Sequence, residues 1–208
     1  MSSSLALEGE GRGEGDTHQI TTMSAKHVTL PLVEEMAVAL HAGDLLQLHG
    51  ILYTARDAAH QRLITALEQG EPPPFPLANQ VIYYVGPAPA KEGQVIGPAG
   101  PTTSGRMDPY TVPLLQLGVR GLIGKGYRSA EIKQALVAYK AVYMAAVGGA
   151  AAILARHVTA SRTIAYADLG TEAIHELTVA DFPVIVINDC HGGDAYETGR
   201  TRYRQSGV

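Results

Sequence analysis

The segment VIYYVGPAPAKEGQVIGPAGPTTSGRMDPY, residues 81–110, decides the expected fold, because an apolar strand leads through a glycine- and proline-rich loop into a helix. Glycines let the loop backbone approach a ligand closely, and prolines stiffen it. The hydroxyls of Thr102, Thr103 and Ser104 would lie at the positive end of the helix, and Arg106 would add a forked donor. The segment therefore predicts an anion-binding corner, with an ordinary capped helix and a joining loop as the alternative.

The composition of the chain favours one folded, soluble domain. Its 208 residues are 46% hydrophobic, which is enough to build a full core. A net charge of -4, two phenylalanines and no tryptophan argue against a nucleic-acid partner. The longest apolar run, near residues 144–154, is short and interrupted by glycines, which argues against a membrane span. The single cysteine, Cys190, excludes an internal disulfide and is compatible with a cytoplasmic location.

The chain is expected to consist of a central domain and two tails. Residues 1–24 predict a flexible tail, residues 25–199 a single α/β domain, and residues 200–208, with three arginines, a flexible C-terminal tail. Thr54 is the expected N-cap of the first long helix. The expected strands are 27–32, 45–53, 81–86, 119–124, 142–147, 163–166, 173–179 and 184–188, and the expected helices are 56–69, 104–117, 129–139 and 150–157. This irregular alternation predicts a mixed sheet with flanking helices rather than a simple doubly wound sheet.

Five blocks of the sequence occur in the order of one known family. They are YTARDAAHQRL (53–63), the segment 81–110 quoted above, GLIGKGYRS (121–129), VGGAAAILA (147–155) and DLGTEAIHELTVADFPVIVIND (168–189). Together they resemble the β subunit of the iron-sulfur hydro-lyases, the class I fumarate hydratase and L-tartrate dehydratase family. The resemblance covers about residues 28–189 and implies a swivelling β/β/α domain of the fumarase C-terminal type. In single-chain members this region is the C-terminal domain, whereas in two-subunit members it is a separate chain.

The resemblance implies an enzyme subunit that reversibly adds water to a double bond beside a carboxylate. Hydration of fumarate to L-malate is the favoured reaction, and L-tartrate dehydration is the alternative. The family uses a [4Fe-4S] cluster, which needs at least three cysteine thiolates, whereas this chain has only Cys190. A cysteine-bearing α subunit is therefore expected to hold the cluster within a higher-order hetero-oligomer, and the isolated chain is expected to be inactive.

Site residues carried over by motif are expected to hold a dicarboxylate or hydroxy-dicarboxylate. Thr102, Arg106 and Lys125 are the expected catalytic residues, with Thr102 taking the proton from the carbon beside the leaving hydroxyl. Threonine is a weak base, so this role needs neighbouring cations to stabilise an alkoxide. Arg56 and Thr103 are expected to bind a substrate carboxylate.

Other residues allow two interpretations each. His60 follows Arg56 by one helical turn and is expected to bind substrate or orient Arg56, with a structural role as the alternative. Arg128 is interpreted as a site residue or a surface arginine, and Glu172 as a partner of a site cation or a solvated carboxylate. The loop at 190–194 lacks the full ligand set of a structural zinc site, so no metal or cofactor ligand is expected in this chain.

One alternative belongs to another functional class. A binding module could use the loop at 97–105 to hold phosphate or another anion without chemistry. This loop lacks the Gly-Lys-Ser/Thr ending of a P-loop, which argues against nucleotide as the anion.

Overall fold

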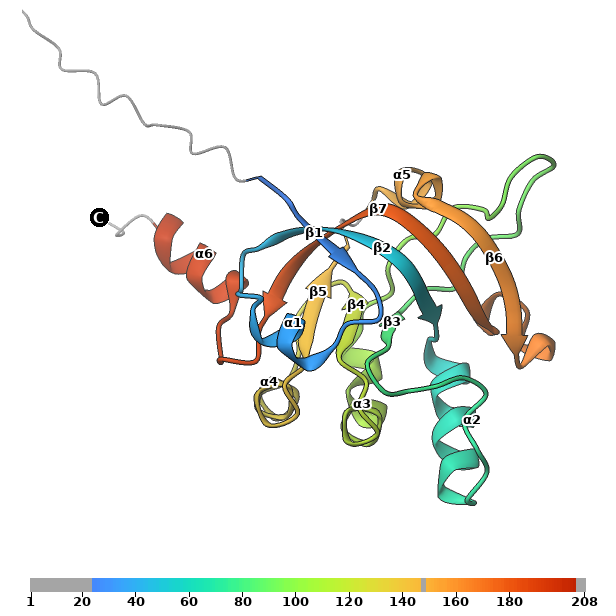
Figure 1. The fold of residues 1–208 in the computed structure, drawn as a ribbon, viewed down its shortest axis with the longest axis horizontal. Coiled ribbons are helices and arrows are strands. Elements are labelled where there is room, and N and C mark those ends of the chain that lie inside the picture. Colours follow the sequence, from blue (N-terminus) through green and yellow to red (C-terminus); the bar gives the residue numbers. More distant parts are fainter. Residues whose placement is uncertain (1–23, 147–148, 205–208) are drawn as a thin grey trace, which may run out of the picture.

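The computed structural model describes residues 24–146 and 149–204 (Figure 1). The expected N-terminal tail, apart from Ser24, lies outside the described residues, as do residues 205–208 of the expected C-terminal tail. None of the helices in the described ranges has both the length and the apolar character needed to cross a membrane.

Strands and helices alternate along most of the chain. The strands are β1 (Lys26–Thr29), β2 (Leu45–Thr54), β3 (Val81–Tyr83), β4 (Gly121–Gly124), β5 (Val142–Ala145), β6 (Val158–Ala165) and β7 (Ile174–Asn188). The helices are α1 (Glu34–Val38), α2 (Asp57–Glu68), α3 (Asp108–Gln116), α4 (Ala130–Ala138), α5 (Ala151–Arg156) and α6 (Ala195–Tyr203). Two 3₁₀ helices, η1 (Ser104–Met107) and η2 (Ala167–Glu172), complete the list.

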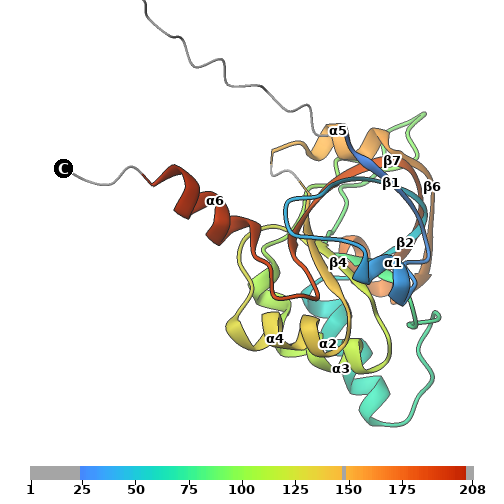
Figure 2. The same cartoon turned by 60° about the vertical axis from the view of Figure 1, so that its left-hand side comes forward.

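The sheet closes on itself. Strands β1 to β5 are parallel neighbours in chain order, and β7 pairs antiparallel with both β5 and β2. Strands β2, β3, β4, β5 and β7 therefore form a closed five-stranded barrel (Figure 2). Strand β1 extends the sheet beside β2, and β6 pairs with β7. Helices α2, α3 and α4 lie together on one side of the barrel (Figure 1). The expected mixed sheet with flanking helices is confirmed.

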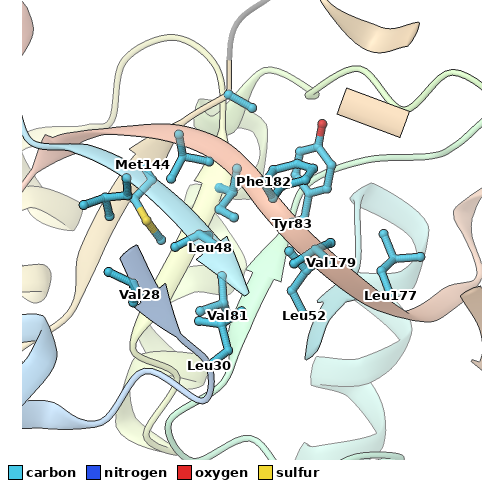
Figure 3. Close-up of a cluster of buried hydrophobic side chains, with 14 of the residues drawn as sticks. Val28, Leu30, Leu48, Leu52, Val81, Tyr83, Met144, Leu177, Val179 and Phe182 are labelled. Carbon is cyan, nitrogen blue, oxygen red and sulfur yellow. The ribbon is translucent and has the colours of Figure 1, made fainter. Parts of the chain in front are cut away.

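Alternate side chains of the barrel strands separate two hydrophobic cores. Val81 and Tyr83 of β3 belong to the cluster inside the barrel, together with Leu48 and Phe182 (Figure 3). Ile82, between them in sequence, belongs to a second cluster that includes buried residues of α2, α3 and α4. Both faces of β3 are therefore buried, which explains why its sequence is continuously apolar.

A β-bulge interrupts the pairing of β2 with β7 near its middle. Leu48 lies opposite Phe182 and Gly50 lies opposite Val179, so two residues of β7 oppose a single residue of β2. One of the two, Asp181, has the left-handed backbone conformation, with φ of 51°. A bulge bends a strand and increases its twist, and both effects help a small sheet to close.

Several expected boundaries are corrected by this arrangement. The expected strands 173–179 and 184–188 form one strand, β7, because the bulge carries the pairing past the Asp-Phe-Pro sequence that suggested a break. Strand β6 begins at Val158 rather than at residue 163. Thr54 does not cap α2, since it ends β2, where its buried hydroxyl donates to Ala173 O at 3.3 Å and accepts from the N–H of His175 at 2.9 Å.

The expected start of the C-terminal tail, at residue 200, falls inside a helix. Asp194 caps α6, because its Oδ1 accepts hydrogen bonds from the N–H groups of Tyr196 at 2.9 Å and Glu197 at 3.2 Å. Lys133 of α4 then pairs with Asp194 at 2.6 Å and with Glu197 at 2.8 Å. The cap and these ion pairs fix the start of α6. The glycine-rich sequence before it gave no indication of a helix.

Gly50→Ala should lower the free energy of unfolding by about 1–3 kcal/mol. Gly50 has φ of 113°, and a Cβ there would lie 3.1 Å from Leu30 O and 3.2 Å from Leu30 Cβ. The matched control is Gly199→Ala in α6, where a Cβ meets no atom within 4 Å and helix propensity favours alanine. Urea unfolding followed by circular dichroism measures both variants. Wild-type stability in Gly50→Ala would contradict a conformational requirement for glycine at this bulge.

Candidate active site

Three parallel strands present their carboxyl ends in one row. Thr54 of β2 pairs with Tyr83 of β3, which pairs with Ile123 of β4. Arg56 and Lys125 each follow this row by two residues. Ligands gather beyond the carboxyl ends of parallel strands in α/β folds. The barrel thus brings two cations that are distant in sequence to one rim.

The loop that follows β3 returns to the same rim and is held there by backbone hydrogen bonds. The N–H of Thr102 donates to Tyr84 O at 2.7 Å, and the N–H of Lys125 donates to Thr102 O at 3.1 Å. The N–H of Ser104 donates to Lys125 O at 2.8 Å, and Thr103 forms a β-bridge with Lys125. Thr102 and Thr103 therefore lie between the ends of β3 and β4.

The expected helix 104–117 is built from two parts. The 3₁₀ turn η1 comes first, and α3 follows it with Pro109 in its first turn. Thr103 directly precedes η1, and its side chain makes no capping hydrogen bond. Because η1 is only four residues long, the backbone bonds to β3 and β4 position this loop more firmly than a helix dipole does.

Buried hydroxyl groups support the loop from below. Ser104 Oγ donates to the Tyr143 hydroxyl at 2.9 Å, and this hydroxyl donates to Gly126 O at 2.9 Å. Burial raises the pKa of Tyr143, so its hydroxyl keeps the proton that it donates. Gly124 provides the space for this network, since a Cβ at Gly124 would collide with Ser104 Oγ.

Arg128 lies beneath the rim and not on the surface, which excludes its interpretation as a surface arginine. Its side chain is fully buried, with Nε donating to Asp108 Oδ1 at 2.8 Å. Its terminal nitrogens donate to the Tyr84 hydroxyl at 3.2 Å and to Thr111 Oγ1 at 2.6 Å. Burial alone lowers the pKa of Arg128, but Tyr84 and Asp108 more than offset it, and the guanidinium stays charged. Arg128, in the segment after β4, therefore joins the residue that follows β3 to α3.

Two carboxylates hold a pair of arginines at the rim. Asp57 Oδ1 lies 2.8 Å from Arg106 Nη2, and Asp57 Oδ2 lies 3.4 Å from Arg56 Nε. Glu172 Oε1 lies 3.3 Å from the same Nε, and Glu172 Oε2 accepts the N–H of Ala58 at 2.9 Å. Glu172 is therefore a partner of a site cation. Within the described part of the chain, these ion pairs use the Nε of Arg56 and neither of its terminal nitrogens, which are the donors that a carboxylate ligand would need.

The rim carries more positive than negative charge. Its cations are Arg56, Arg106 and Lys125, and its carboxylates are Asp57 and Glu172. Arg106 and Lys125 are exposed, whereas Arg56 is three-quarters buried. An excess of one positive charge beside the hydroxyl groups of Thr102 and Thr103 favours an anionic ligand. The exposure of Thr103, Arg106 and Lys125 makes this part of the rim an open face.

His60 is completely buried under this face. Its Nδ1 lies 3.0 Å from Arg56 O, and its ring packs edge-on against Tyr84 and stacks on Tyr110. Burial lowers the pKa of His60 to about 4, so the ring is neutral near pH 7. These contacts support the structural alternative for His60, in which the ring positions the backbone at Arg56 and does not touch substrate.

The structure brings together the other residues carried over by motif. Arg56, Thr102, Thr103, Arg106 and Lys125 all lie on or beside the rim. The sequence did not predict the supporting network around Tyr84, Tyr143 and Asp108. Tyrosines within apolar strand sequences indicate core packing, and no sequence spacing connects them with Arg128 or Ser104.

The polar side chains at the end of β7 and in the loop after it are engaged in structural contacts. Cys190 is 2% exposed, and burial raises the pKa of its thiol. The Asp189 carboxylate accepts hydrogen bonds from the N–H groups of Ala42, His191 and Gly193. Asp194 caps α6 in the same way. The carboxylates of Asp189 and Asp194 therefore serve as acceptors for backbone N–H groups.

The chain matches proteins of known families over most of its length. Residues 9–199 match the family described as Fumarase C-terminus. The chain is 36% identical over 186 residues to fumarate hydratase 2 of Leishmania major, an alignment that covers 87% of this chain and 33% of that protein. It is 37% identical over 154 residues to the aerobic class I fumarate hydratase of Escherichia coli K12, covering 73% of this chain and 28% of that protein.

A shorter relative is matched over most of its own length. The chain is 40% identical over 164 residues to the "Putative L(+)-tartrate dehydratase subunit beta" of Methanocaldococcus jannaschii, covering 76% of this chain and 84% of that protein. By contrast, the alignments cover about a third or less of the fumarate hydratases.

The fold and the rim define a closed α/β barrel domain with a cationic, hydroxyl-bearing face at the carboxyl ends of its parallel strands. The chain belongs to the fumarase C-terminus family. This confirms the resemblance that the five sequence blocks indicated.

The buried His60 predicts a loss of stability as the pH falls. Its pKa is about 4 in the folded chain and about 6.5 when unfolded. Between these values the unfolded chain binds a proton that the folded chain excludes, so the free energy of unfolding decreases by up to about 1.4 kcal/mol per pH unit from this group. Urea unfolding from pH 7.5 to 4.5 should show a shallower pH dependence in His60→Gln than in the wild type.

The control for this measurement is His41→Gln, which replaces an exposed histidine. It should keep the wild-type pH dependence. The absolute stability of His60→Gln is not the readout, since replacement of a buried ring also changes packing. Parallel pH dependences in His60→Gln and the wild type would show that His60 does not resist protonation in the folded chain.

Proposed function

We propose that this chain is the β subunit of a hydro-lyase that interconverts fumarate and L-malate by reversible addition of water. The observation that carries the proposal is the arginine pair bridged by Asp57, next to the loop in which Thr102 is bonded to Lys125. Such a face suits a ligand with two carboxylates, because its forked and point-charge donors come from η1 and from the segments after β2 and β4. The fumarate hydratases among its relatives support this reaction.

L-Tartrate dehydration is the second candidate reaction. It is favoured by the Methanocaldococcus jannaschii relative, which is named as a tartrate dehydratase β subunit and aligns with this chain over 84% of its length. The two substrates differ in their hydroxyl groups, and selection between them depends on polar groups placed to bind or reject a hydroxyl. The same face would bind the carboxylates in both cases.

The residues of this chain do not fit an iron-sulfur cluster. A [4Fe-4S] cluster is held by several cysteine thiolates, whereas Cys190 is the single cysteine here and is buried. Burial also raises the pKa of its thiol, which opposes thiolate formation. We therefore assign the cluster to a cysteine-bearing α subunit, with a cytoplasmic hetero-oligomer as the proposed assembly.

Within this proposal the residues of the rim have distinct roles. Arg56 and Arg106 bind carboxylate oxygens, and Thr103 donates a hydrogen bond to one of them. During dehydration the alkoxide of Thr102 accepts the proton from the carbon beside the one that bears the hydroxyl. The C–H electron pair becomes the double bond, and the hydroxyl departs with the C–O pair as hydroxide, whose charge the cluster of the partner subunit would stabilise as a Lewis acid. The proton held by Thr102 then converts the hydroxide to water and restores the alkoxide. Lys125 stabilises the alkoxide. Its position next to Thr102 in the backbone network favours this role.

We further propose that the domain swivels to bring its open rim against the partner. Exposed cations interact weakly with ligands in water, and closure of a second surface over them strengthens the same contacts by excluding water. Structures of the assembly with and without a dicarboxylate would test this step. The same domain orientation in both would contradict it.

Anaerobic purification of the tagged full chain from its own host tests the function. We expect an iron-sulfur protein with several cysteines to co-purify, and the complex to hydrate fumarate. Activity on L-tartrate alone would favour the second candidate. A partner without either activity would contradict both substrates, and anion binding by the isolated chain with no partner would favour a non-catalytic binding module.

Thr102→Ala should lower kcat of the complex by at least about 100-fold, because it removes the proton-transfer group. The KM for fumarate should change little, since the arginine pair stays in place. The matched control is Thr198→Ala, an exposed threonine in α6 that should leave both constants unchanged. Co-purification of the partner is measured with each variant. Near-normal turnover in Thr102→Ala would remove Thr102 from the mechanism.

A further inference from the structure

Three metal-binding side chains converge on the outside of the barrel, away from the rim. His27 comes from β1, His49 from β2 and Asp181 from the bulge in β7. His27 Nδ1 lies 3.1 Å from His49 Nε2, and Asp181 Oδ1 lies 3.2 Å from His49 Nε2 and 3.8 Å from His27 Nδ1. Among the residues that the structure describes, these form the only group of three or more His, Cys, Asp or Glu with ligand atoms within mutual reach.

The bulge explains how the carboxylate reaches the two histidines. His49 is the single residue of β2 that stands opposite two residues of β7, and Asp181 is one of those two. The left-handed backbone of Asp181 turns this residue out of the regular alternation. Bulges commonly redirect a side chain in this way. On the other side of β2, the parallel register sets Thr29 opposite His49 and leaves His27 two residues earlier in β1, within reach of His49.

We propose that His27, His49 and Asp181 bind a divalent first-row metal ion, with Zn²⁺ as the best match. Zinc holds imidazole nitrogens and carboxylate oxygens at about 2.0–2.2 Å, which separates neighbouring ligands of a tetrahedron by about 3.3 Å. The three separations here are 3.1, 3.2 and 3.8 Å. The donor atoms therefore already form one face of a tetrahedron. A water molecule completes the coordination, because the side chains of His27 and Asp181 are 67% and 54% exposed.

The ligand chemistry selects the type of ion. Two imidazoles and one carboxylate suit zinc and the neighbouring transition metals better than calcium or magnesium, which prefer oxygen ligands. Metal binding needs the lone pair of His49 Nε2, so the ring proton moves to Nδ1. The hydrogen bond between His27 Nδ1 and His49 Nε2, at 3.1 Å, and the long hydrogen bond from the N–H of Asp181 to His49 Nδ1, at 3.4 Å, are then lost. Two solvent-exposed hydrogen bonds are a small cost beside three metal–ligand bonds.

The ion would join three strands that are distant in sequence. Among the described strands, β1 pairs only with β2, and the metal ties it also to β7. An ion that binds only the folded chain raises its thermal stability. The site is separate from the candidate active site, because His49 precedes the end of β2 by five residues, about 16 Å at about 3.3 Å per residue.

The test uses Co²⁺ as a spectroscopic probe and Zn²⁺ as the competitor. The full chain, freed of any polyhistidine tag and of chelators, is titrated with Co²⁺ while the visible absorption of four-coordinate cobalt is recorded. We expect one Co²⁺ per chain, its displacement by Zn²⁺, and a higher melting temperature with Zn²⁺. Loss of an outer-shell partner alone costs about 10- to 100-fold in metal affinity, so His49→Gln and Asp181→Asn should each weaken binding at least tenfold.

Matched controls separate this site from general binding by histidines. Asparagine tolerates the left-handed conformation, so Asp181→Asn keeps the bulge. The control variant replaces His41 and His191 with glutamine, which removes another stacked histidine pair on the surface and should leave Co²⁺ binding unchanged. Absence of stoichiometric binding in the wild type would overturn the proposal. Wild-type affinity in His49→Gln and Asp181→Asn, or loss of binding in the control, would overturn it equally.

Discussion

The pairing of β7 with both β2 and β5 is the constraint on which the rest of the structure depends. Without it, β2 to β5 would form an open parallel sheet with unpaired edges and one apolar face without a cover. With it, the inner face becomes a closed core and the outer face packs under the helices. Closure also fixes the row of strand ends from which Arg56 and Lys125 emerge.

The same strand connects the closure of the barrel to the charges of the rim. The Thr54 hydroxyl joins the end of β2 to the start of β7 through Ala173 and His175. Glu172, one residue before Ala173, thereby reaches Arg56. Two arginines that lie close together in a partly buried site repel each other by an energy on the order of 1 kcal/mol. Carboxylates fixed by the fold offset this repulsion, so the arginine pair persists before any ligand arrives.

The sequence predicted the elements of the fold better than their closure. Strand and helix positions followed from apolar runs and from caps such as Ser129, which accepts the N–H of Ile132. The barrel did not follow, because it depends on a long-range pairing and on a bulge at Asp181 that no local pattern indicates. Motifs located the rim residues. Their supports did not emerge from the sequence, since Tyr84 and Arg128 meet only after folding. His27 and His49 likewise become neighbours only through the register of β1 and β2.

The backbone of the rim is fixed by hydrogen bonds, whereas its charged side chains are exposed to water. Thr102 and Lys125 are fixed by backbone hydrogen bonds, so their positions cost little entropy when a ligand binds. The charged groups differ, because Arg106 is 54% exposed and Lys125 is exposed, and in water such groups gain at most about 1 kcal/mol from each ion pair. A preformed but solvated cationic face binds a small dicarboxylate weakly by itself. Covering the face lowers the local dielectric and strengthens every charged contact at once. Under the proposed function, the rim is therefore half of a site, and the proposed partner subunit supplies the other half.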